Sequence, residues 1–238
     1  MNGEGAIEGE AAPERGQVKR SAIRCGRPPR ELKGRVDERI LDAAGKVFLE
    51  RGFSGATVDE IAEVAGAGKP TIYARFPGKE ALFTAVMERL VRRNTSLEAI
   101  PCAGASIEDR LTALAVAILN TVLEPEHIGL IRVAVAEARR FPELATSVSR
   151  MARERKAEAV GRLLAKFADS DQTRALPAFA PDRLPETAFR FLNLTVLPML
   201  MRALFGEDLA ALRAEIGPHV ARSVAFFLAA CGCREHAC

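Results

Sequence analysis

The first regular pattern of apolar residues begins near residue 36, where apolar side chains recur at intervals of three and four. This spacing places them on one face of an amphipathic α-helix, and Gly52 predicts the end of that helix. Gly45, inside the helix, costs about 1 kcal/mol relative to alanine in helix propensity, so its presence predicts close packing there. The apolar residues are Val36, Ile40, Ala44, Val47 and Phe48.

Two shorter helices are predicted next. Thr57 and Glu60 have the spacing of a capping box, in which each side chain accepts from the other residue's backbone N–H, and Gly66 closes the helix. Residues 69–76 predict a further helix, in which Pro70 is tolerated because its missing N–H would be unpaired in the first turn anyway. Two short helices joined by a glycine-containing turn, behind a longer helix, predict a helix-turn-helix with residues 69–76 as the recognition helix.

From residue 79 onward the pattern stays helical, with breaks at segments that contain glycine or proline. No strand-like alternation is long enough to predict a sheet. We therefore expect an all-α fold, with an N-terminal three-helix helix-turn-helix head and a larger helical body. The helices expected after the head span residues 79–95, 106–123, 126–140, 143–169, 184–205 and 207–230, with a kink at Pro198.

Composition supports this assignment and adds a basic N-terminal arm. The chain has 238 residues, of which 48% are hydrophobic and 5% aromatic, enough apolar material for a core with little strand-favouring content. Residues 15–35 carry eight basic side chains and one acidic one, although the net charge of the whole chain is only +3. A basic arm on a mildly acidic body indicates either a contact with a polyanion or a solvated tail.

Other functional classes find little support in the sequence. Residues 1–35 contain no apolar run of the signal-peptide kind, and the most apolar segments are shorter than the roughly 20 residues of a membrane-spanning helix. We therefore expect a cytoplasmic protein with no membrane partner. The run at 66–71 lacks the first glycine of a phosphate-binding loop and has Pro70 in place of its Ser or Thr. The three histidines are scattered, so we expect neither enzyme activity nor a cofactor.

The run GAGKPTIYARFPGKEALF at 66–83 closely resembles the helix-turn-helix signature of the TetR/AcrR family of repressors, including the spacing of its Tyr, Phe-Pro and Lys-Glu-Ala-Leu-Phe. With the helices before it, the resemblance covers residues 36–85. Residues 130–144, which contain AEARRFPEL, resemble the ligand domain of the AefR-like branch. The sequence departs from the family at Gly68, where a small polar cap is common, at Pro70, and at Ala74 and Arg75, so it does not predict the operator sequence.

The resemblance implies phosphate contacts by Thr57, Tyr73 and Lys79. Ile72 and Phe76, four residues apart, are expected to face the core, which leaves Lys69 and Thr71, with Arg75 as a further candidate, to approach base edges. Thr57 and Lys79 lie at predicted helix N-termini, where free amides favour an anion. Purely structural roles, such as a cap or a packed aromatic, are the alternative. The Gly-Arg-Pro run in the arm predicts either insertion into an A·T-rich minor groove or nonspecific attraction to phosphates. The predicted DNA-binding residues are Thr57, Lys69, Pro70, Thr71, Tyr73, Arg75 and Lys79, with Arg27 and Arg30 of the arm.

Specific recognition of a double-stranded DNA operator requires two recognition helices about one DNA turn, roughly 34–36 Å, apart. The resemblance implies a homodimer through the last two helices, and an intramolecular core is the alternative for the apolar stripe found there. That stripe consists of Leu209, Leu212, Ile216, Val220, Val224 and Phe227. The resemblance further implies a small apolar or amphipathic ligand inside the body. The candidate ligand-binding residues are Leu114, Ile118, Ile131, Val135, Glu137, Phe167, Phe191 and Asn193, with Arg132 as a further polar group.

The patterns predict a basic arm at 1–34, a helix-turn-helix domain at 35–82, a regulatory and dimerisation domain at 83–230, and a cysteine-rich tail at 231–238. The resemblance implies that such a chain is a repressor released by a ligand. Two alternatives remain. The tail holds three cysteines and His236, a set that suits a soft metal or a redox disulfide, so one alternative is a repressor that responds to metal or thiols. The other is a nonspecific architectural DNA-binding protein built on the basic arm.

Overall fold

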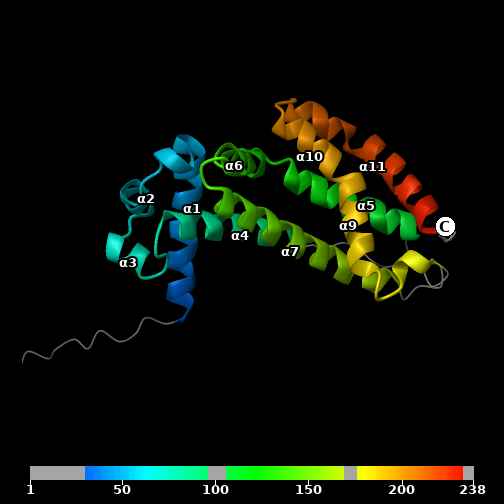
Figure 1. The fold of residues 1–238 in the computed structure, drawn as a ribbon, viewed down its shortest axis with the longest axis horizontal. Helices are drawn as coiled ribbons and strands as arrows, with labels where there is room; N and C mark the ends of the chain where they lie inside the picture. The colour runs from blue at the N-terminus through cyan, green and yellow to red at the C-terminus, as the bar shows by residue number, and fades with distance from the viewer. Residues whose placement is uncertain (1–29, 96–105, 169–175, 233–238) are drawn as a thin grey trace, which may run out of the picture.

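The computed structural model describes residues 30–95, 106–168 and 176–232, and these residues contain helices and no β-strand, which confirms the all-α prediction (Figure 1). The head comprises α1 (Arg30–Gly55), α2 (Val58–Ala65) and α3 (Lys69–Tyr73), and α4 (Lys79–Thr95) leads from it into the body. The body comprises α5 (Ile107–Val122), α6 (Pro125–Ala136), α7 (Pro142–Ala168), the short 3₁₀ turn η2 (Pro177–Phe179), α9 (Leu184–Thr195), α10 (Leu197–Leu204) and α11 (Leu209–Gly232).

The helix breaks follow local chemistry. Gly52 has φ +69°, a left-handed conformation, and interrupts the regular helix of α1 where the sequence predicts its end. Gly66 likewise ends α2 with φ +57°, and its N–H donates back to the last turn. Near Pro198 the chain divides into α9 and α10, separated at Val196, because a proline supplies no N–H to the preceding turn. The predicted kink is confirmed.

Two helices end earlier than their apolar patterns predict. Helix α3 stops at Tyr73 instead of residue 76, although the N–H of Phe76 still donates to the carbonyl of Ile72 at 2.8 Å, so the chain continues as a turn. Helix α6 stops at Ala136 instead of residue 140, and the chain passes through turns before α7 begins at Pro142. Both segments are followed by a proline, which disfavours helical backbone in the residue before it.

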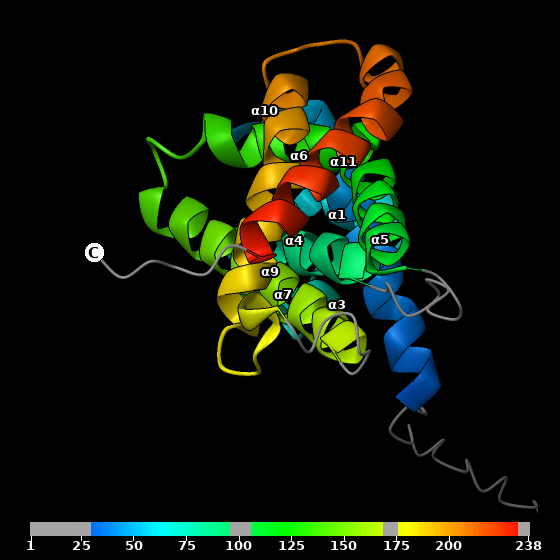
Figure 2. The ribbon, with the colours of Figure 1, turned by 90° about the vertical axis from the view of Figure 1, so that its right-hand side faces the viewer.

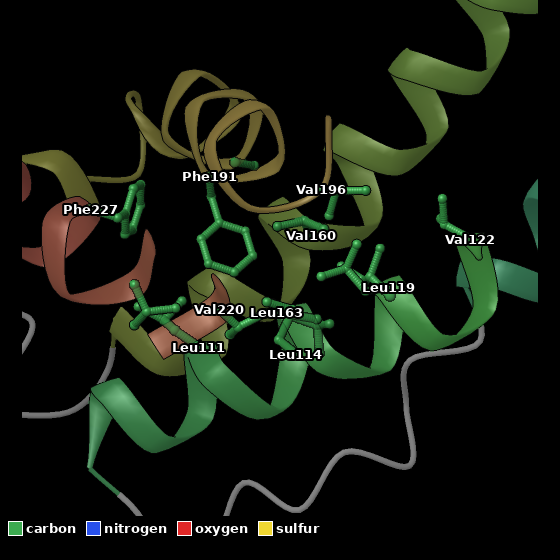
Figure 3. Close-up of a cluster of buried hydrophobic side chains, with 14 of the residues drawn as sticks. Leu111, Leu114, Leu119, Val122, Val160, Leu163, Phe191, Val196, Val220 and Phe227 are labelled. Atoms are coloured by element: carbon green, nitrogen blue, oxygen red, sulfur yellow. The ribbon is translucent and has the colours of Figure 1, made fainter. Parts of the chain in front are cut away.

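The molecule is elongated, with α1, α2 and α3 at one end and α11 lying over α5 and α9 toward the other (Figures 1 and 2). Two apolar clusters fill it. The cluster of the body joins α5, α7, α9 and α11, and the rings of Phe191 and Phe227 meet there edge to face with centroids 5.3 Å apart (Figure 3). The cluster of the head includes Phe48, Phe53 and Phe83, whose rings are in mutual contact.

The predicted border between head and body at residue 82 does not coincide with a gap in packing. Phe83, Leu130 and Val148, from α4, α6 and α7, all belong to the head cluster. Helix α1 also begins at Arg30, inside the segment assigned to the arm. Within the described residues no single helix is long and apolar enough to cross a membrane, and the one pair that passes such a test jointly, α5 with α6, is bent by 68°.

Gly45 does not mark the close packing expected of it. A Cβ atom at this position would lie 3.8 Å from Cγ1 of Val86 and 4.0 Å from the nearest atoms of Arg89 and Glu126, which are ordinary van der Waals distances. The close approach occurs instead at Gly129 of α6, where a Cβ atom would lie 2.5 Å from Cδ2 of Leu49. The tight contact is therefore between α1 and α6.

Candidate nucleic-acid interface

Thr57 begins α2 and is exposed. It adopts the extended backbone of an N-cap, and its hydroxyl accepts from the backbone N–H of Glu60 at 3.2 Å. In the predicted capping box the Glu60 carboxylate would also accept from the backbone N–H of Thr57. It accepts from Nε of Arg51 at 3.1 Å instead. The first turn of α2 therefore presents an exposed hydroxyl, while the cap that orders it rests on one hydrogen bond.

Helix α3 is amphipathic in the predicted sense. Ile72 is fully buried and Phe76 packs against the head cluster, whereas Lys69, Pro70 and Tyr73 are exposed. The Tyr73 side chain is 50% exposed, so its ring is not part of the core. At the start of the helix, Gly68 is the N-cap and supplies no side-chain hydrogen bond, as its lack of a side chain requires. The burial of Ile72 and Phe76 thus holds this short helix with one face outward.

Two predicted DNA-binding side chains already have acidic partners in the head. Nζ of Lys69 lies 2.7 Å from Oδ1 of Asp59 on α2, and this pair is exposed. The guanidinium of Arg75 binds Asp37 of α1 and donates to the carbonyl of Thr71 at 3.3 Å. Arg75 is thus turned toward α1 and not simply outward as its position in the sequence suggests. Thr71 is partly buried.

Lys79 lies at the N-terminus of α4, as predicted, but it has a structural task as well. Its ammonium donates to the carbonyls of Ser54 and Ala56 at 3.2 and 3.0 Å and lies 4.8 Å from the centre of the Phe53 ring. An ammonium has three donors, and two are used here. One donor therefore remains for a phosphate oxygen, so the structural and the predicted DNA-binding roles are compatible.

The arm residues lie outside what the structure can test. Arg27 falls outside the described residues, and Arg30 begins α1 without a described side chain. The predictions for both remain predictions.

The predicted ligand-binding residues are not gathered around one cavity. Four of them, Leu114, Ile118, Phe167 and Phe191, are packed in the body cluster. Ile131 packs against the head cluster instead. Val135, which is 62% exposed, and Asn193 lie at the surface, while Glu137 accepts from the backbone of Ser54, and Arg132 donates to the carbonyls of Ala203 and Leu204 at the end of α10.

The body contains a basic pair, the buried His127 and the half-buried Lys156, that the sequence did not single out. His127 of α6 is buried, and burial, together with the charge of Lys156, lowers its pKa to about 3. Burial also lowers the pKa of Lys156 of α7 to about 8. The two residues are 29 positions apart in the sequence, so no local motif reveals the pair.

The apolar stripe of the last helix is used inside the chain. Leu212, Ile216, Val220, Val224 and Phe227 are all buried in the body cluster, so the alternative of an intramolecular core holds for them. Other apolar side chains of α9, α10 and α11 and of the turn after α10 remain exposed. They are Phe189, Leu197, Met201, Phe205 and Phe226, and Phe205 and Phe226 reach 84% and 67% exposure.

The cysteine-rich tail offers no described metal site. Among the described residues no group of three or more His, Cys, Asp or Glu side chains is placed to hold a metal ion. Cys231 is buried, and burial raises its pKa to about 11, which disfavours the thiolate that binds metals. Residues 233–238, including His236, lie outside the described residues.

Known proteins share both parts of this architecture. Residues 40–86 match the family described as bacterial regulatory proteins, tetR family, and residues 109–233 match the AefR-like transcriptional repressor C-terminal domain. The HTH-type transcriptional activator FasR of Mycolicibacterium smegmatis is 47% identical over 58 residues, or 23% of this chain and 26% of FasR. The HTH-type transcriptional repressor ComR of Escherichia coli is 35% identical over 82 residues, 34% of this chain and 39% of ComR. These matches thus span less than half of either relative.

Solved structures extend the likeness over most of the chain. A TetR-family transcriptional regulator of Mesorhizobium loti has a TM-score of 0.67 and 25% identity, covering 85% of this chain and 98% of that one. The Flavonoid-responsive Regulator FrrA has a TM-score of 0.64 and 29% identity, covering 86% of this chain and all of FrrA. The helix-turn-helix head, the helical body and both family matches agree: the chain belongs to the TetR family and is a DNA-binding transcriptional regulator with an AefR-like C-terminal domain.

Proposed function

We propose that this regulator is a homodimeric repressor that binds a DNA operator through two copies of α3 and leaves it when a small apolar or amphipathic ligand enters the body. The observation that carries the DNA contact is the face of α3, where Lys69 and Tyr73 are exposed while Ile72 beneath them is fully buried. Thr57 and the third donor of Lys79 flank this face as phosphate contacts. Such a function is exercised in the cytoplasm, where the operator lies.

The exposed apolar side chains of α9, α10 and α11 support the homodimer. Isolated apolar residues at a surface need no explanation, but Phe226 and Phe205 are large, strongly exposed and accompanied by Phe189, Leu197 and Met201. A dimer that presents two recognition helices to DNA needs a second copy of the chain, and the same helices of that copy would cover these exposed side chains. The dimer thus uses the last helices, as predicted, through residues other than the predicted stripe.

Two observations support ligand release. The structural relative FrrA is described as flavonoid-responsive. The second is the pair His127, which is buried, and Lys156, which is half-buried and whose charge lowers the pKa of His127; they are polar groups in a mainly apolar body. We therefore expect the ligand to combine apolar surface with an acidic or hydrogen-bonding group.

The test begins with selection of bound sequences from random DNA duplexes, using the full chain. The selected duplex should bind at least about 10³-fold more tightly than an unrelated duplex at physiological salt. Affinities within a few-fold of each other would refute sequence-specific regulation and favour nonspecific binding. A panel of aromatic and acyl acids is then added to the complex, and release by none of them would refute the proposed ligand class.

A further inference from the structure

Ser54, near the end of α1 and after the break at Gly52, is held through all three of its polar groups. Its N–H donates to Oε1 of Glu137 at 3.2 Å, its hydroxyl accepts from Nη1 of Arg140 at 3.2 Å, and its carbonyl accepts from Nζ of Lys79 at 3.2 Å. Glu137 and Arg140 are 83 and 86 positions away along the chain. An exposed serine at the end of α1 is thus fixed by side chains of the body and of α4.

The two body residues belong to one compact turn. Glu137 is the C-cap of α6, and its carbonyl accepts from the N–H of Phe141 at 2.8 Å. The Phe141 ring meets the ring of Phe53 edge to face with centroids 5.0 Å apart, and the guanidinium of Arg140 lies 5.5 Å from the Phe141 ring. The turn therefore binds residues 53 and 54 of the head by an aromatic contact and two hydrogen bonds.

This contact lies close to the start of the DNA-binding helices. Ser54 precedes the exposed N-cap Thr57 by three residues, and Gly52 with its left-handed backbone separates Ser54 from the regular part of α1. The partners of Ser54 therefore act on the short segment that joins this break to the N-cap of α2. Glu137 ends α6, so a shift of α6 moves one of these partners directly.

We propose that Glu137 and Arg140 are positioning residues, which hold Ser54 and through it the start of α2 in the orientation that the operator requires. This proposal rests on the proposed function and adds its regulation, since movement of α6 would release Ser54 and loosen the head. Both residues lie in the segment AEARRFPEL, so this segment would position the head relative to the body. Phe53, Phe83 and Phe141, together with Glu137, line a small cavity beside the turn.

The first test is binding to the selected duplex and to an unrelated duplex. Glu137→Ala and Arg140→Ala should each weaken operator binding about five- to tenfold, the equivalent of one hydrogen bond to a charged group at a hydrated site. Glu137→Gln and Arg140→Lys keep an acceptor and a donor and should recover most of the affinity. Arg139→Ala removes the same charge from the same turn at an exposed position and is the matched control.

The second test needs no DNA. Hydrogen exchange of the Ser54 amide should become about tenfold faster in Glu137→Ala and stay unchanged in Arg139→Ala, with thermal unfolding close to that of the wild type. Unchanged exchange in Glu137→Ala would overturn the contact itself. Faster exchange with unchanged operator affinity would overturn the positioning role. A wild-type chain that fails to distinguish its selected duplex would overturn the proposed function alone, while the exchange data would still decide on the contact.

Discussion

Replacing Lys79 by alanine distinguishes the structural role of its side chain from its proposed phosphate contact, because the first affects stability and the second affects DNA binding. The change removes two donors, at 3.2 and 3.0 Å from the carbonyls of Ser54 and Ala56, and a cation 4.8 Å from the Phe53 ring. The exposed Ser54 regains water as a partner, whereas Ala56 is buried and its carbonyl is harder to hydrate. The loss thus amounts to about one charge-assisted hydrogen bond, roughly 1.5 kcal/mol, plus about 0.5 kcal/mol for the cation and ring.

We therefore expect Lys79→Ala to lower the free energy of unfolding by about 2 kcal/mol, or the melting temperature by roughly 4–8 °C for a chain of this size. Urea denaturation followed by circular dichroism measures the first quantity. If the third donor of Lys79 also binds a phosphate, the slope of log K for DNA binding against log salt should become shallower by about 0.9 per protomer, or about 1.8 for the proposed dimer.

The exposed Lys46 of α1 provides the control, since Lys46→Ala makes the same chemical change elsewhere on the head. Stability within about 0.5 kcal/mol of the wild type in Lys79→Ala would refute the argument from the two carbonyls. A destabilised variant whose salt slope is unchanged would refute the phosphate contact instead.

Three further predictions concern Gly45, His127 and Phe226. Gly45→Ala should raise the free energy of unfolding by about 1 kcal/mol in urea denaturation, because its Cβ atom meets only ordinary contacts; a loss would mean that α1 and α4 pack more tightly than these distances indicate. Because the folded pKa of His127, about 3, lies below the ordinary 6.5, the unfolded chain binds the extra proton first as the pH falls. Stability should decrease from pH 6.5 downward by up to about 1.4 kcal/mol per unit, and His127→Asn should flatten this decline. Phe226→Ser should give folded monomers in sedimentation velocity, whereas Phe227→Ser should unfold the body; a dimer that survives Phe226→Ser and also Phe205→Ser would place the interface elsewhere.

The parts of the fold that follow from local chemistry could be predicted from the sequence. The start and end of α2 depend on its caps Thr57 and Gly66, and the periodicity of three and four reports which face of a helix is buried, as Ile72 shows. Helices α3 and α6 end early because a following proline and the available tertiary contacts outweigh the continuing apolar pattern.

The parts that depend on distant partners could not be predicted. Arg75 looks outward in a helical projection, but Asp37, 38 positions earlier, binds it. Lys79 occupies the predicted helix start, yet the carbonyls that it binds are those of Ser54 and Ala56, more than 20 positions away. The sequence suggests Glu137 as a polar group of a ligand pocket, and in the fold its carboxylate also accepts from the N–H of Ser54. In each case the residue type limits which interactions are possible, but the partner is known only from the folded structure.

Helix α11 shows why a stripe of apolar residues predicts burial but not the surface that covers it. Phe227 is 4% exposed and Phe226 67%, although both are phenylalanines at adjacent positions. Adjacent residues on a helix point about 100° apart, so a helix that is apolar at both has two apolar faces. Here the chain's own α5 and α9 cover the face that contains Phe227 and leave Phe226 exposed. The stripe chosen from its regular spacing is consequently the intramolecular one, and the apolar side chain that this chain leaves uncovered belongs to the less regular face.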